Sequence, residues 1–481
     1  MIDEIAFEDD AVTFETVRYH PSRGYGAYDH HGGVLSRPST DSESGVPSSN
    51  VASHELSHFW LHAATPFGEL LDEFASVQVG DMLRYCSELD GQRLPIPIAA
   101  HRAARDRGET RGPTAAALRR HVRPWSRTLL VEHVLEGLDN NAVRSADLAK
   151  VLDWIVEFES RAVDSASGPL VPDDIAPMSD YQRRLPALWA DAYRDHPIPP
   201  CPPTSFGEAS APLGASHLFE SHALLMEGAG AFDAINADRR ALYLGIYVSV
   251  FSHFGVSRVT SEAEVRVVMA TCALLIDLAL YCPIGRIYGR KRHDQMTWYD
   301  IHPGYRFMRL LDVMSEEHWV DDIDERAPRI QEALSRRLGW ESPESFLELG
   351  ANLTDFSGQA RHARACQLRL ERPDHGILWR ESDLAAVEQL FNEHGPIQVV
   401  DGSKCVVPGP THQRRVDRLV QFALHRLTWM VMAHGNIDAN ALVPPGLPFS
   451  APYVNFRHGE DAMTLLEEAM PYLARDNFVK A

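Results

Sequence analysis

Apolar residues recur at helical spacing along most of the chain. From Val51 to about Tyr85 they fall three and four residues apart, and we expect a break at 65–68 because proline inside a helical pattern ends or kinks the helix. Further helices are predicted at 113–138, 145–163, 214–235, 236–255, 261–281, 303–318, 325–339, 343–370, 382–394, 412–434 and 460–475, and candidate strands at 11–19, 377–381 and 397–401. The pattern predicts a mainly α fold, with one large helical domain and few short strands.

Changes in composition divide the chain into five parts. The stretch 25–50 is rich in Gly, Ser, Pro and Asp and is predicted to be a loop, whereas 168–212 contains too much proline for continuous helix. The parts are an irregular N-terminal segment with a candidate strand (1–50), a helical part (51–165), a proline-rich linker or surface loop (166–212), a second helical part (213–370) and a mainly helical C-terminal part (371–481).

The charge and the cysteines narrow the class of protein. The 481 residues carry a formal net charge of −21, which argues against nucleic acid as a partner because phosphate binding needs a basic surface. No apolar run reaches the length of a membrane span. The acidic N-terminal stretch lacks the basic and apolar regions of a secretory signal, and the six cysteines form no Cys-x-x-Cys pair. We therefore expect a cytoplasmic protein with reduced thiols, whose oligomeric state the sequence leaves open.

One short motif carries metal chemistry. His54-Glu55-x-x-His58 opens the first predicted helix, and residues four apart lie on one helical face, so both imidazoles can bind one ion. Glu55 would then hold and deprotonate a water molecule on that ion. His62, one turn further, is expected to support the site or to pack rather than to act as a further ligand, because the helix rises about 12 Å between residues 54 and 62; the role of ligand stays the less favoured alternative. The alternative is a histidine-rich helix start without a metal.

A catalytic zinc site needs a third protein ligand. The best candidate stretch is 218–228, where Glu220 and Glu227 lie seven residues apart and so share a helical face in an apolar setting. We favour Glu220 as the ligand and Glu227 as the carboxylate that orients His54 or His58, and we keep the reverse assignment open. Both could also be exposed helix carboxylates.

These two stretches resemble known metalloproteins. His54-Glu55-x-x-His58 with a distant Glu220-x-x-Ala223 helix is similar to the gluzincin class of zinc metallopeptidases, and more closely to bacterial proteins known mostly as uncharacterised HExxH-containing proteins. In gluzincins a glutamate of a Glu-x-x-Ala helix is the third ligand. The resemblance therefore implies a zincin-like active-site helix that binds zinc through His54, His58 and Glu220. The pattern does not predict the β-sheet whose edge strand holds a peptide in that class.

A basic and aromatic island at 286–311 is the candidate for substrate contacts in this acidic chain. Two of its arginines could clamp a carboxylate or phosphate, and three of its aromatic residues could donate a hydrogen bond to an oxyanion beside the ion. The alternative is a surface loop followed by a helix near Pro303. The arginines are Arg290 and Arg306, and the aromatic residues are Tyr299, His302 and Tyr305.

Together these features predict a zinc-dependent hydrolase of a peptide or amide bond, with Glu55 as the general base for a metal-activated water. Two other classes stay open. One is a metalloenzyme of natural-product or peptide-modification biosynthesis, with Fe²⁺ in place of Zn²⁺ if it is an oxygenase. The other is a non-enzymatic helical interaction protein with a structural metal. For either enzyme, the partner is a peptide or a small-molecule substrate.

Overall fold

The structure is a computed structural model of the chain, and it describes part of the 481 residues. The described residues are 27–29, 33–37, 48–88, single positions between 125 and 137, 203–206, 209–227, 235, 240–253, 261–288, 298–314, 323–353, 359–378, 383–401, 404–407, 411–429, 442 and 444. The predicted strand at 11–19 and the predicted helices at 145–163 and 460–475 lie outside them, as does nearly all of the helix predicted at 113–138.

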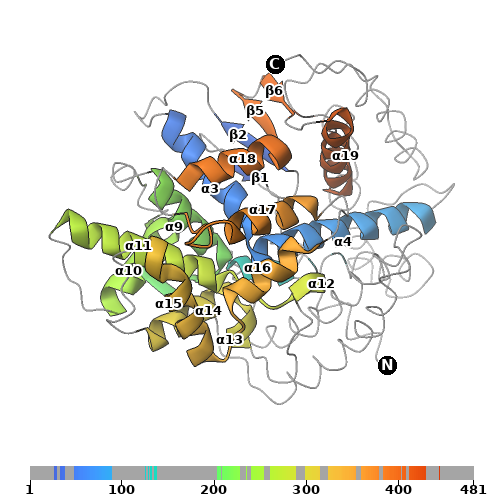
Figure 1. Cartoon of the computed structure of the whole chain (residues 1–481). Helices are drawn as coiled ribbons and strands as arrows, with labels where there is room; N and C mark the ends of the chain where they lie inside the picture. The colour runs from blue at the N-terminus through green and yellow to red at the C-terminus, as the bar shows by residue number, and fades with distance from the viewer. Residues whose placement is uncertain are drawn as a thin grey trace, which may run out of the picture.

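Most of the described residues are helical, as the sequence predicts (Figure 1). The helices are α3 (Ser48–Ala64), α4 (Pro66–Glu88), α9 (Ala215–Glu227), α10 (Arg240–His253), α11 (Glu262–Ala279), α12 (Gly285–Tyr288), α13 (Trp298–Ile301), α14 (Pro303–Val313), α15 (Ile323–Leu338), α16 (Pro343–Ala351), α17 (Ala360–Leu370), α18 (Leu384–His394) and α19 (His412–Trp429).

The expected break between the first two helices is confirmed at Thr65. Its hydroxyl donates to the carbonyl of Leu61 and accepts from the backbone N–H of Gly68, so one side chain serves the end of α3 and the start of α4. Pro66 is the first residue of α4, where the missing N–H of proline removes no helical hydrogen bond. The single helix predicted at 343–370 is wrong, because α16 ends at Ala351 and α17 begins at Ala360.

A four-stranded sheet lies beside α3 and corrects two predictions. Its strands are β1 (Ala27–Asp29), β2 (Val34–Arg37), β5 (Ile397–Val400) and β6 (Lys404–Val406), in the order β1-β2-β5-β6. The outer pairs are antiparallel and β2 pairs in parallel with β5, so Val34 lies opposite Ile397. The stretch 25–50 is therefore not all loop, and a sheet, which the sequence does not predict, contacts the helix that carries the histidines. Figure 1 shows this sheet at the top of the molecule.

A second, two-stranded sheet falls within the proline-rich stretch. It is formed by β3 (Pro203–Phe206) and β4 (Ala209–Pro212), which pair antiparallel. The strand predicted at 397–401 is confirmed as β5, whereas residues 377 and 378 of the candidate strand at 377–381 have no strand structure.

The core is centred on α3, α9 and α11. Helix α11 begins at a capping box, in which the Ser261 hydroxyl accepts from the backbone N–H of Glu264 while the Glu264 carboxylate accepts from the N–H of Ser261. Its second half, from Ala270 onward, is buried on all sides. None of the described helices combines the length and the hydropathy that a membrane span requires.

Candidate metal centre

The two helices that carry the predicted ligands pack along each other. His54, Glu55 and His58 lie on α3, and Glu220 and Glu227 lie on α9. Asn50, near the start of α3, donates to the backbone carbonyl of Glu227 at the end of α9 (3.0 Å), so the two helices run in opposite directions.

Three ligand atoms form a compact triangle. The Nε2 atoms of His54 and His58 are 3.0 Å apart, and Oε2 of Glu220 lies 3.3 Å from the first and 3.7 Å from the second. In a tetrahedral zinc site with bonds of about 2.0–2.1 Å, neighbouring ligand atoms are about 3.4 Å apart. A point about 2 Å from all three atoms therefore lies near the centre of the triangle. The three residues fit a metal ion of that size.

Glu227 is placed to orient His54. Its Oε1 lies 2.6 Å from Nδ1 of His54, on the side of the ring opposite the triangle. A hydrogen bond from Nδ1–H to this carboxylate leaves the Nε2 lone pair pointing toward Glu220 and His58, as in carboxylate–histidine–metal arrangements. Glu220 and Glu227 therefore lie at different nitrogens of the His54 ring, and their roles as ligand and orienting carboxylate stay predictions.

The electrostatics of the cluster favour positive charge at its centre. Burial disfavours protonated His54, but hydrogen bonds to Glu220 and Glu227 outweigh burial and raise the pKa of His54 to about 10. Burial also acts against the charged form of Glu220, yet the charge of His58 and hydrogen bonds from both histidines hold the pKa of Glu220 well below its usual value. A proton or a metal cation satisfies this arrangement.

Glu55 is a buried carboxylate beside the triangle. Burial raises the pKa of Glu55, and the nearby charges of His58 and His54 act in the opposite direction. Its Oε2 is buried and has no hydrogen-bond partner among the described residues. A buried polar atom normally has a partner, so this oxygen is suited to hold a water molecule next to the ligands.

The cluster is partly open to solvent in the described part of the chain. The Glu220 side chain is 26% exposed, and the side chains of His54 and His58 are 10% and 13% exposed. Three protein ligands with an accessible side are typical of catalytic zinc sites, whereas structural sites are closed by four.

His62 belongs to a neighbouring network. Its Nδ1 is 2.7 Å from the hydroxyl of Tyr28 on β1, and its Nε2 is 3.3 Å from Oδ1 of Asp72 on α4. Asp72 in turn accepts from Arg361 on α17. The contacts of His62 therefore connect the C-terminal end of α3 to the sheet and to two helices.

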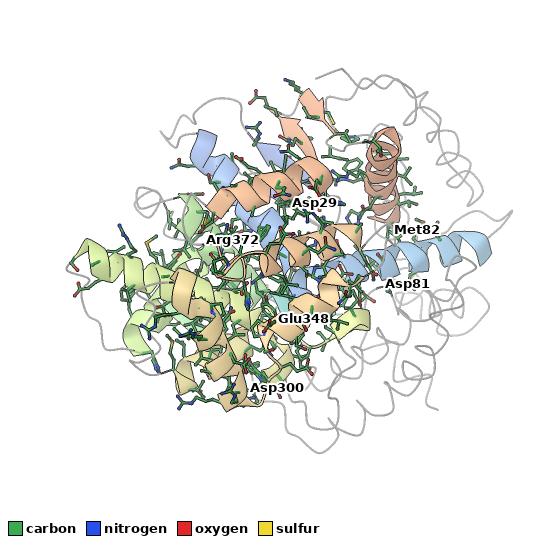
Figure 2. All side chains as sticks on the ribbon, in the orientation of Figure 1. Asp29, Asp81, Met82, Asp300, Glu348 and Arg372 are labelled. Carbon is green, nitrogen blue, oxygen red and sulfur yellow. The ribbon has the colours of Figure 1, made fainter. Side chains whose placement is uncertain are left out.

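The structure gives the basic and aromatic island a role in packing. The Arg306 guanidinium donates to the carbonyls of Ala279 (3.1 Å), Leu278 (3.2 Å) and Asp300 (2.8 Å), which ties α14 to α11 and α13. These bonds occupy Nε, Nη1 and Nη2 of a buried side chain, so its expected part in substrate binding finds no support in them. Figure 2 labels Asp300 at the lower edge of the molecule.

The aromatic members of the island pack against one another. The ring of Tyr305 is 5.0 Å from that of Tyr299 and 5.3 Å from that of His302, both edge to face. Tyr305 and His302 are buried, and Tyr299 is partly exposed. Arg290 lies outside the described residues. No contact described between these residues and others reaches the triangle, so their expected catalytic roles stay predictions.

One tyrosine beside the cluster is missed by the sequence reasoning. The ring of Tyr243 on α10 lies 6.1 Å from that of His54. It is placed there because α10 is bonded to α9, with the hydroxyl of Ser221 donating to the carbonyl of Tyr243 and that of Tyr247 to the carbonyl of Ser221. Tyr243 sits in an apolar helical pattern, and no local signal sets it apart from a core residue.

No protein-family model, no curated protein and no solved structure matches this chain. The likeness to gluzincins therefore stays an expectation based on two motifs.

Proposed function

We propose that this chain is a metal-dependent hydrolase, with zinc as the metal and a peptide or amide bond as the substrate group. The observation that carries the proposal is the triangle of two imidazole nitrogens and one carboxylate oxygen, with sides of 3.0, 3.3 and 3.7 Å, at a partly open position. Glu55 supports hydrolysis in particular, because a buried carboxylate next to the ion is what a general base requires.

Each residue has a distinct task in this proposal. A zinc ion held by His54, His58 and Glu220 would acidify a bound water molecule and polarise the carbonyl of the substrate. Glu55 would serve as the general base, because its buried Oε2, which has no hydrogen-bond partner among the described residues, could take a proton from the attacking water and pass it to the leaving amine. Glu227 keeps Nδ1 of His54 protonated, so that Nε2 stays available as a ligand.

A second candidate keeps the site and changes the reaction. Two histidines and one carboxylate on one face of an ion are also the ligand set of non-haem Fe²⁺ oxygenases. The same triangle therefore supports an iron-dependent enzyme that modifies a peptide or a small molecule in a biosynthetic pathway. Such a reaction has no evident need for Glu55 as a base, which is why we place hydrolysis first.

A purely structural metal site is the third candidate. The exposure of Glu220 and the presence of only three ligands among the described residues argue against it, because structural zinc sites bind four protein ligands.

Elemental analysis of the purified protein tests the metal centre. We expect about one Zn²⁺ or Fe²⁺ per chain, lost in both His54→Ala and His58→Ala, while the exposed His253→Ala serves as a matched control that keeps its metal. Full occupancy in both ligand variants would refute the site.

Glu55→Gln tests the reaction. It should keep the metal and lose turnover of a peptide library, whereas Glu348→Gln, an exposed glutamate on α16, should change neither. If Glu55→Gln removes the metal, Glu55 is a ligand and the proposed base is wrong. Oxygen consumption by the Fe²⁺-loaded protein, with no cleavage by the Zn²⁺-loaded protein, would favour the second candidate.

A further inference from the structure

A buried hydrogen bond joins the two ligand-bearing helices next to the triangle. Oγ of Ser57 on α3 lies 2.7 Å from Nδ1 of His222 on α9. Ser57 falls between His54 and His58 in the sequence, and His222 follows two residues after Glu220. Both side chains are fully buried, at 0% and 1% exposure.

His222 has a second polar partner besides Ser57. Its ring also contacts the backbone carbonyl of Leu378. A rotation of the ring would break at least the bond to the buried Ser57 hydroxyl.

The carbonyl of Leu378 belongs to a loop that is itself fixed to α3. Arg369, at the end of α17, donates from Nε to the carbonyl of His375 in this loop (2.6 Å) and from Nη1 to the carbonyl of Ala64, the last residue of α3 (3.0 Å). Its Nη2 forms a buried ion pair with Asp277 on α11 (2.8 Å). The contact with Leu378 therefore connects His222 on α9 to a loop that Arg369 ties to α3.

A serine bonded to a histidine can also be a nucleophile with its base. Here that interpretation fails, because no substrate can reach a hydroxyl that is 0% exposed. Ser57 and His222 can therefore affect the site only by holding α3 and α9 together.

Metal ligands tolerate displacements of only about 0.2 Å. We infer that the bond between Ser57 and His222 sets the separation of α3 and α9, and thereby holds Glu220 at bonding distance from an ion on His54 and His58. Both are positioning residues for the metal centre, and the inference rests on the proposed function.

Two amide variants of His222 separate its two bonds. Asparagine places its carbonyl oxygen near the position of Nδ1 and can still accept from Ser57, whereas glutamine places its amide near the position of Nε2 and loses the bond to Ser57. We expect Zn²⁺ affinity, measured by competition with a chromophoric chelator, to fall about tenfold or more in His222→Gln and in Ser57→Ala, and to stay within about threefold of wild type in His222→Asn. The d–d absorption of bound Co²⁺ should change in the first two variants only.

Leu218→Ala is the matched control for general loosening of α9. Leu218 lies one turn before His222 on the same face, is fully buried and forms no hydrogen bond through its side chain. It should lower the unfolding temperature and leave Zn²⁺ affinity unchanged. Equal weakening in Leu218→Ala, or wild-type affinity in Ser57→Ala and His222→Gln, would overturn the inference while the metal centre stands. A wild-type protein that binds no Zn²⁺ and no Co²⁺ would overturn both.

Discussion

Replacing each glutamate of α9 in turn tests the different roles that the structure gives them. Oε2 of Glu220 completes the triangle, whereas Oε1 of Glu227 lies 2.6 Å from the far side of the His54 ring. Glu220→Ala therefore removes a ligand, and Glu227→Ala removes only the partner that orients one. Both alanine variants should fold, because both glutamate side chains are partly exposed to solvent and alanine has a high helix propensity.

The expected losses differ in size. Structural zinc sites with four ligands bind with about 10–16 kcal/mol, so one ligand contributes roughly 3 kcal/mol, and Glu220→Ala should weaken Zn²⁺ binding by about a hundredfold. Loss of a hydrogen-bond partner behind a ligand costs about 10–100-fold, and Glu227→Ala should fall toward the lower end because His54 keeps its ring position within the helix pair. Glu227→Gln should lose less than Glu227→Ala, because the amide oxygen of glutamine can still accept a hydrogen bond from Nδ1–H of His54.

Chelator competition at fixed pH gives these affinities, and circular dichroism checks that each variant is folded. Glu348→Gln supplies the baseline, because Glu348 is an exposed glutamate on α16 (Figure 2). A larger loss in Glu227→Ala than in Glu220→Ala would exchange the two roles. Wild-type affinity in both would refute a metal site built on α9.

Three further predictions concern stability. Arg369→Met should cost about 3–5 kcal/mol of unfolding free energy in urea, because Asp277 would be left as a buried charge without its cation; a loss below about 1 kcal/mol would contradict this. Burial lowers the pKa of three histidines to about 4, namely His217, His222 and His362. Between pH 6.5 and about 4, these three histidines bind protons in the unfolded chain but stay neutral in the folded one. Urea titrations should therefore show that the free energy of unfolding falls as the pH is lowered from 6.5 to about 4. A free energy of unfolding that does not change over this range would be inconsistent with neutral buried rings. Zn²⁺ at about a hundred times its Kd should add about 2.7 kcal/mol and raise Tm, and a chelator should reverse the rise; an unchanged Tm would argue against binding to the folded state.

The spacing of apolar residues along the chain was sufficient to predict where most of the described helices lie. The periods that predict 325–339 and 382–394 correspond to α15 and α18 within two residues at each end, because both are amphipathic and one side of each faces the core. The strands β1 and β2 were missed for the opposite reason. Each is only three or four residues long. β2 pairs with β5, far along the chain, and a local pattern carries no information on such a partner.

In the candidate site too, contacts within one helix could be predicted from the sequence, whereas contacts between helices could not. The sequence predicts the arrangement of His54, Glu55 and His58, because the geometry of one helical turn determines their relative positions. In the same way, a spacing of seven residues places Glu220 and Glu227 on one helical face. The offset of α9 along α3 decides which glutamate meets both histidines, and that offset is a tertiary property. The Ser57–His222 bond depends on the same offset, and Tyr243 reaches the cluster only through the packing of α10 on α9.

The pairing of β2 with β5 has a practical consequence for protein production. Residues 34–37 and 397–400 form one ladder, and Tyr28 on the adjoining strand bonds the helix that bears the histidines. Trimming either end past these strands would strip a neighbour from the remaining one and expose its backbone groups, a known route to aggregation. Any shortened version made for crystallisation should therefore retain both segments.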